Sequence, residues 1–148
     1  MRAVIQRTTG ASVEVENKVI GEIEHGLVVF LGVEEGDTEQ DLNYICDKVV
    51  GLRVFDDENE IPNRSVADVG GSVLLISQFT LCADARKGRR PSYIKAARPE
   101  TAIPLYEAAI KRIAESVPVE HGQFQANMQV RLVNDGPHTI LLDSKKVF

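Results

Sequence analysis

The chain is poor in the residues that define several protein classes. It has no tryptophan, only two cysteines and only three histidines among 148 residues. Cys46 and Cys82 lie far apart without a CxxC pair, so we expect them to be reduced, buried apolar side chains rather than a disulfide. No histidine stands at metal-ligand spacing from another histidine or a cysteine. We therefore expect no structural zinc and no cofactor.

Long apolar runs are also missing. The longest, Leu27 to Leu31 with Val33 just beyond, is far too short to span a bilayer. The first seven residues, MRAVIQR, lack the apolar stretch and small-residue cleavage site of a signal peptide. A cytoplasmic protein is the expectation. The length suits one domain over residues 1–148, and no repeat or low-complexity tract divides it.

The net charge of -5 does not indicate a nucleic-acid-binding protein, but the cations are unevenly distributed along the sequence. The segment Ala85–Pro99 (ARKGRRPSYIKAARP) contains no acidic residue. Screening confines each charge to about 10 Å, so positive potential can persist locally on an acidic protein. The segment could bind phosphate, with Tyr93 stacking on a base, or it could be a solvated loop that neutralises neighbouring acids. The candidate phosphate contacts are Arg86, Lys87, Arg89 and Arg90.

Apolar patterning predicts strands at both ends of the chain. The first third suggests an antiparallel meander of four short strands, the last of which is apolar on consecutive positions and should be buried on both faces. A central strand follows later, and two strands end the chain. The expected strands are Ala3–Ile5, Ser12–Glu16, Val19–Ile23, Gly26–Val33, Gly71–Leu81, Asn127–Val133 and Thr139–Asp143.

Two helices are predicted between these strands. The first should begin at Asp37 or Thr38 as N-cap, and the second should run from about Pro99 to Ser116. Residues 56–71 are polar and read as loop or weak strand. The expected buried positions are Leu42, Ile45, Val49 and Leu52 in the first helix, and Ala102, Tyr106, Ala109, Ile110 and Ile113 in the second. One α+β domain is the result.

The stretch Ser77-Gln-Phe-Thr-Leu81 places polar residues at the end of a buried strand. Buried polar groups need hydrogen-bond partners or a ligand. Ser77 and Thr80 could act as nucleophiles, yet no nearby histidine or lysine offers itself as their base. Backbone N–H groups leaving the sheet could instead stabilise an oxyanion. The alternative, hydroxyls that bond their own backbone, is common.

Four turn-forming residues, Asn134-Asp-Gly-Pro137, separate the last two predicted strands. Local chemistry alone predicts a hairpin connection here. His25 and His121 each stand in a predicted turn. His138 alone lies beside a motif of interest, and work as a general base is the minority interpretation for it.

Taken together, these segments resemble the bacterial D-aminoacyl-tRNA deacylase family from end to end. GGSVLLISQFTL carries the SQFTL signature, GRRPSY matches the basic loop, and NDGPHT matches Asn-x-Gly-Pro-x-Thr. MRAVIQR, ASVEV and GLVVFLGV resemble the family's start. The resemblance implies an α+β fold with largely antiparallel sheets forming a barrel-like core and two main helices. It also implies a homodimer with its active sites at the subunit interface.

The family hydrolyses the ester that joins a D-amino acid, or glycine, to the 3′-terminal adenosine of tRNA, including mischarged glycyl-tRNA(Ala). The resemblance implies that a cis Gly136–Pro137 peptide reaches into the partner's pocket and excludes an L side chain. Arg7 would brace this motif, and Asn134 and Thr139 would support it. Catalysis in the family relies on the 2′-hydroxyl of the substrate's terminal ribose, which would explain the missing base.

Carried over by motif, Ser77, Gln78, Phe79 and Thr80 would line the adenosine and ester site. Main-chain N–H groups near Phe79 and Thr80 would serve the oxyanion, with the Thr80 hydroxyl as nucleophile a second possibility. The implied pocket walls are Phe124, Met128 and Ala102. The sequence departs from the family at Gln125, where Gly or Ala is common, and at His138, where Val is usual. A non-catalytic module that binds RNA 3′ ends is the alternative from another class.

Overall fold

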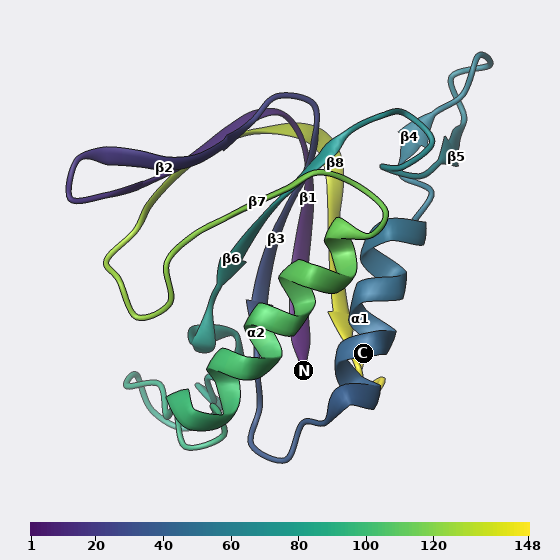
Figure 1. Ribbon diagram of the computed structural model, residues 1–148. Coiled ribbons are helices and arrows are strands. Elements are labelled where there is room, and N and C mark those ends of the chain that lie inside the picture. Colours follow the sequence, from purple (N-terminus) through teal and green to yellow (C-terminus); the bar gives the residue numbers. More distant parts are fainter.

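The computed structural model describes residues 1–148 as sheets covered by two helices (Figure 1). In chain order the elements are β1 (Arg2–Val15), β2 (Lys18–Ile23), β3 (Gly26–Gly32), α1 (Glu39–Gly51), β4 (Phe55–Asp56), β5 (Pro62–Arg64), β6 (Ser72–Ser77), the 3-10 turn η1 (Phe79–Cys82), α2 (Pro99–Ala114), β7 (Val119–His121) and β8 (Gln129–Asp143). No helix is both long enough and apolar enough to cross a membrane.

The main sheet has the order β2-β1-β3-β6-β7, and β8 also pairs with β1. Along β1, residues 2–8 pair with β3 and residues 11–15 pair with β2, while β8 pairs along residues 2–14. β1 is antiparallel to β2, β3 and β8, whereas β3–β6 and β6–β7 are parallel pairs. The four strands of the predicted meander form three, β1 to β3; they are antiparallel as expected, but β2 and β3 both pair with β1 and not with each other. β6 joins in parallel because the chain crosses over through α1 before it returns to the sheet. The barrel-like α+β class with two main helices is confirmed.

Residues 2–15 form one long strand, where the sequence suggested two. The residues between the two predicted strands, around Thr8, stay in the sheet and pair with both β3 and β8. There the Thr8 hydroxyl lies 2.8 Å from Gly10 O and 2.7 Å from Val133 O, so its one proton has an acceptor on either side, and it accepts from Gly10 N–H (3.1 Å). Pairing with the neighbouring strands therefore decided the outcome.

The predicted hairpin at Asn134–Pro137 is wrong. Both flanks run antiparallel to β1 as one strand, β8, with the pairs Gln6–Thr139 and Thr8–Asn134. Between these pairs β1 advances two residues and β8 advances five, so the turn-forming residues bulge out of the sheet. A hairpin would have reversed the chain. Turn chemistry thus identified a departure from regular strand geometry but not its kind.

The strands β3 and β6 are buried on both faces, as predicted for β3. On one face Val29 and Leu75 join the core under α1 and α2, which both cover that side of the sheet (Figure 1). On the other face Val28 and Leu74 join a smaller core closed by half-buried residues of β8. The consecutive apolar residues of both strands follow from this double burial.

The helices begin where the sequence placed them. Thr38 is the N-cap of α1 in a capping box, in which its backbone N–H donates to Asp41 Oδ2 (2.8 Å). α2 starts at Pro99 and ends at Ala114, two residues earlier than expected. Of the predicted buried positions, Leu52 and Ile110 are only half-buried.

Two local assignments need correction. β6 ends at Ser77 rather than continuing to Leu81, because the next residues coil into η1. His121 lies in the short strand β7 and not in a turn, since β7 pairs in parallel with β6. His25 does lie in the bend between β2 and β3. Both cysteines are buried and free, as expected.

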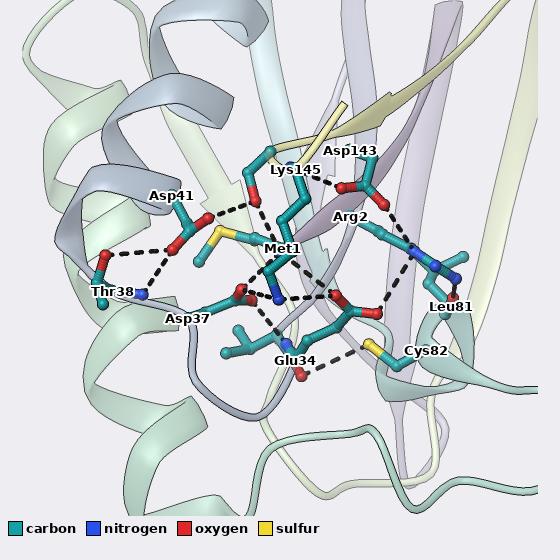
Figure 2. A network of polar contacts seen from close by, with 12 residues as sticks. Met1, Arg2, Glu34, Asp37, Thr38, Asp41, Leu81, Cys82, Asp143 and Lys145 are labelled. Atoms are coloured by element: carbon teal, nitrogen blue, oxygen red, sulfur yellow. Dashed lines mark hydrogen bonds and ion pairs between the residues drawn. The ribbon is translucent and has the colours of Figure 1, made fainter. Parts of the chain in front are cut away.

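A polar network joins the two ends of the chain beneath η1 (Figure 2). The buried Met1 amino group donates to Asp37 Oδ1 (2.7 Å) and to Ser144 Oγ (2.9 Å). Arg2 and Lys145 add cations, and Glu34, Asp41 and Asp143 add further carboxylates. The network fixes the start of β1 against the end of β8, far apart in sequence.

Candidate functional site

A cavity of about 580 Å³ lies beside the carboxyl end of β6. One wall is formed by the end of β6 and the residues that follow it, and the other by the segment between β7 and β8. The start of α2 contributes Pro99. Of the residues expected in the site, the cavity is lined by Ser77, Gln78, Phe79, Phe124 and Met128. The structure therefore brings together two motifs that are more than forty residues apart.

The first wall turns sharply at η1. Gln78 N–H donates to Leu31 O (2.8 Å), which anchors the turn to β3, and the first hydrogen bond within the turn runs from Leu81 N–H to Gln78 O (3.2 Å). The N–H groups of Phe79 and Thr80 precede that bond, so they have no acceptor inside the turn. Of these two donors, only that of Phe79 belongs to a residue that lines the cavity.

The Thr80 hydroxyl is engaged with its own turn. It accepts a short hydrogen bond from the Gln78 side-chain amide, and no histidine, lysine or carboxylate contacts it. Thr80 was expected to line the site, but it does not line the cavity. A serine- or threonine-type nucleophile needs an adjacent base, and this arrangement supplies none.

The second wall rests on a buried tyrosine. The Tyr106 hydroxyl donates to Leu75 O (2.9 Å) and its ring lies 6.0 Å from that of Phe124. Burial raises the pKa of Tyr106, which keeps the phenol a neutral donor. A Cβ atom at Gly122 would lie 2.5 Å from Met128 Sδ, so a larger residue there would displace the flexible Met128 side chain from the wall.

Two expectations about the walls change. Ala102 does not line the cavity but lies 4% exposed in the core against which Phe124 packs. Gln125, which departs from the family pattern, lines the cavity with a φ of 65°. L residues rarely adopt such a left-handed conformation, whereas glycine does so freely. Glycine would fit the backbone at this position without strain.

The Gly136–Pro137 bulge is separate from this cavity within one chain. Both residues are exposed, their peptide bond is cis, and neither lines the cavity. β1 holds the bulge from beneath. Arg7 Nε lies 2.9 Å from Asp135 Oδ2, Gln6 donates to Thr139 Oγ1 (3.1 Å), and Asn134 donates to the same oxygen (3.5 Å).

The basic loop, residues 84–92, is closed at its base by hydrogen bonds. Backbone bonds between Asp84 and Ser92 (2.8 and 2.9 Å) close its base. Arg86 folds back in two side-chain hydrogen bonds to Asp84, which hold the pKa of that carboxyl well below its usual range. Lys87, Arg89 and Arg90 have no carboxylate partner. Tyr93 lies outside the closed base, edge-on to Phe79 with 5.3 Å between ring centroids.

Comparison with known proteins agrees with this arrangement. A family model described as D-Tyr-tRNA(Tyr) deacylase matches residues 4–143. The chain belongs to this family. Proteins named D-aminoacyl-tRNA deacylase from Koribacter versatilis (strain Ellin345) and Thermosipho africanus (strain TCF52B) are 57% and 54% identical, each over 100% of both chains. The resemblance stated from the motifs is thus confirmed.

Solved structures show the same fold. The structure named c-Myc DNA Unwinding Element Binding Protein is 37% identical, with a TM-score of 0.91 over 97% of this chain and 98% of that one. A probable eukaryotic D-amino acid tRNA deacylase has a TM-score of 0.79 over 95% of this chain and 98% of that one. At 15% identity the second likeness shows the fold alone.

Sequence reasoning missed several residues of this family member's site. Asp135 pairs with Arg7 across the sheet, and Arg2 contacts the end of η1. The cavity lining also includes Ile76, Ala97, Ala126, Asn127 and Val130. No spacing rule connects Arg7 with Asp135 or Arg2 with Leu81, because each contact depends on strand register or on the crossing of distant segments.

Proposed function

We propose that the protein is a carboxylic ester hydrolase that cleaves D-aminoacyl-tRNA, and glycyl-tRNA(Ala), into free amino acid and tRNA. Membership of the D-Tyr-tRNA(Tyr) deacylase family and close relatives named D-aminoacyl-tRNA deacylase support the reaction. The observation that carries it is a cavity lined by Phe79, at a turn in which the N–H groups of Phe79 and Thr80 have no acceptor and the Thr80 hydroxyl has no base beside it. The substrate would also locate the protein in the cytoplasm.

In this proposal the cavity holds the terminal adenosine and the ester. Water adds to the ester carbonyl carbon, the N–H groups of Phe79 and Thr80 stabilise the oxyanion, and the C–O bond to the ribose breaks. The leaving 3′-oxygen takes up a proton. The neighbouring 2′-hydroxyl of the substrate assists in place of a protein base. Ser77 and Gln78 position the nucleotide, while Phe124 and Met128 provide apolar walls.

Chiral selection in this proposal uses a second subunit. Gly136 and Pro137 are exposed and away from the cavity of their own chain, so they are free to enter the cavity of a partner. A homodimer is further supported by β8, whose outer edge pairs with no strand and whose Val133 and Leu141 are 60% and 57% exposed. The Gly-Pro carbonyls would bind the substrate's amino group and leave no room for an L side chain.

The tRNA body would contact the basic loop. Lys87, Arg89 and Arg90 have no carboxylate partner, so their charges are available to phosphates. Arg86 contributes less in this scheme, because Asp84 already holds it. Tyr93, beside the cavity wall, could stack on an unpaired base.

Incubation of the purified protein with D-Tyr-tRNA and L-Tyr-tRNA tests the proposal. We expect selective loss of the D-ester. Release of neither ester, with binding of the RNA end retained, would instead favour a non-catalytic module that binds RNA 3′ ends.

A matched pair of changes separates the catalytic schemes. Thr80→Val removes the hydroxyl and keeps the backbone N–H, so it should retain most of the activity. D-Tyr-tRNA that ends in 2′-deoxyadenosine should be hydrolysed far more slowly by the unaltered protein. Loss of activity in Thr80→Val with full activity on the deoxy substrate would support Thr80 as nucleophile.

A further inference from the structure

The end of η1 is held by a side chain from the start of β1. Arg2 Nη1 donates to Leu81 O (3.1 Å), as Figure 2 shows. The last carbonyls of a helical turn have no donor within the turn, so they depend on partners from elsewhere. A 3-10 turn of four residues has poor internal hydrogen-bond geometry and cannot fix its own orientation. Its two ends therefore determine where it lies.

Arg2 is itself rigidly placed. Its Nε donates to Asp143 Oδ2 (3.0 Å) and lies 3.6 Å from Glu34 Oε1. Asp143 is 2% exposed and its other oxygen accepts from the backbone N–H of Lys145 (2.7 Å). Different nitrogens of one guanidinium thus bond a buried carboxylate and the Leu81 carbonyl at the same time. A lysine ammonium is a compact point charge and lacks this planar fork.

We propose that Arg2 is a positioning residue for the Gln78–Cys82 turn and, through it, for the N–H groups of Phe79 and Thr80. This inference rests on the function proposed above. At its start the turn is fixed by the bond from Gln78 N–H to Leu31 O (2.8 Å), and at its end by Arg2. Without Arg2, the one side-chain hydrogen bond left to that end is a long one, from Cys82 Sγ to Val33 O (3.5 Å).

Arg2 acts on the reaction without touching the substrate. It does not line the cavity that holds Phe79 and Phe124. Removing its bond to Leu81 would leave the cavity walls in place but let the two N–H donors move away from the developing oxyanion. Such donors count mainly in the transition state, so kcat should fall while KM changes little.

The test compares Arg2→Gln and Arg2→Lys with Lys145→Met. Lys145 belongs to the same network, 3.3 Å from Glu34 Oε2 and 3.5 Å from Asp37 Oδ1, but makes no contact with η1. Steady-state kinetics with D-Tyr-tRNA are measured well below each variant's unfolding temperature. Arg2→Gln should lower kcat by roughly 10-fold or more, since loss of one oxyanion donor costs about 100- to 1,000-fold. KM should stay within about 2-fold, because ground-state binding is unaffected.

The two companion variants give the controls. Arg2→Lys keeps the cation beside Asp143, and thus the fold, but should recover little of the lost kcat. Lys145→Met should lower the unfolding temperature yet keep kcat. Equal loss of kcat in Lys145→Met and Arg2→Gln, or an unchanged kcat in Arg2→Gln, would overturn the proposal.

Chemical rescue adds a readout that a purely structural role would not move. Arg2 also lines a second cavity, of about 590 Å³, which lets a small cation reach its place. Millimolar guanidinium should restore part of the kcat of Arg2→Ala and none of any loss in Lys145→Met. Absence of rescue together with a full kcat in Arg2→Ala would contradict the inference.

Hydrogen exchange of the backbone amides in residues 77–83 tests the positioning role of Arg2 even if no deacylation is detected. Arg2→Gln should accelerate exchange there, whereas Lys145→Met should not. Accelerated exchange without any activity in the unaltered protein would sink the proposed function and leave the positioning contact standing. Unchanged exchange in Arg2→Gln would sink the positioning role alone.

Discussion

Arg7 Nε lies 2.9 Å from Asp135 Oδ2, and this ion pair joins the middle of β1 to the bulge of β8. The same guanidinium donates through Nη1 to Val54 O (2.7 Å) and lies 5.9 Å from the centre of the Phe55 ring. Arg7 is 8% exposed. One buried cation therefore connects the central strand, the bulge and the segment after α1.

Arg7→Met should loosen the bulge as well as the fold. It leaves Val54 O without a donor and Asp135 without its cation, so the free energy of unfolding should fall by about 2 to 3 kcal/mol. Urea denaturation measures this loss. With D- and L-Tyr-tRNA as substrates, the preference for the D-ester should also shrink. Arg7→Lys is the control, because it retains the charge. If Arg7→Met kept the full preference for the D-ester over the L-ester, the ion pair would have no part in chiral selection.

Gln125→Gly should stabilise the protein. Gln125 has a φ of 65°, where an L residue is strained and glycine is not. Glycine loses more entropy on folding, so the net gain should be about 0.5 to 1 kcal/mol. Ala126→Gly next to it is the matched control, since Ala126 does not have a positive φ and should lose stability. Equal effects of the two changes in urea denaturation would contradict this account.

The arginines of the basic loop should contribute unequally to tRNA binding. Replacing both Arg89 and Arg90 with Gln should weaken tRNA binding and reduce the log–log salt slope by about 0.7 to 0.9 for each phosphate that is no longer neutralised. Arg86→Gln should change the slope less, because Asp84 already neutralises that cation. Asp84→Asn, which frees Arg86, should steepen the slope. Titrations of tRNA at several KCl concentrations measure all three.

The two buried cysteines should lower the free energy of unfolding at alkaline pH. Burial raises the pKa of Cys82 to about 11 and that of Cys46 to about 12. In the unfolded chain the thiols ionise near about 8.5, so the unfolded state releases protons first as pH rises. Their contribution is therefore full below about 8.5 and lost as pH rises toward the folded values. Urea midpoints should fall above that pH, and less so in a protein with both Cys46→Val and Cys82→Ala.

Local sequence determined much of the fold. The capping box at Thr38 and the spacing of Leu42, Ile45 and Val49 set α1, because these interactions lie within a few residues of one another. The unbroken apolar run of β3 reported its burial on both faces. Through the family they resemble, the motifs also identified some residues on both cavity walls, whereas Ala102 and Thr80 were expected there and do not line the cavity.

Features that depend on pairing between distant segments could not be predicted from the sequence. The sequence could not tell a hairpin from a bulge at Asn134–Pro137, since the same turn residues serve both. The difference lies in whether the two flanks pair with each other or both with β1.

The sequence by itself determined the helices, the buried strands and the motifs of the site, because propensity, capping and periodicity act over short distances. Only the tertiary structure decided that Gly136 and Pro137 stand apart from the cavity of their own chain, that Arg7 meets Asp135, and that Arg2 holds Leu81. Those contacts arise when strand register brings distant segments together, and no local pattern encodes that register.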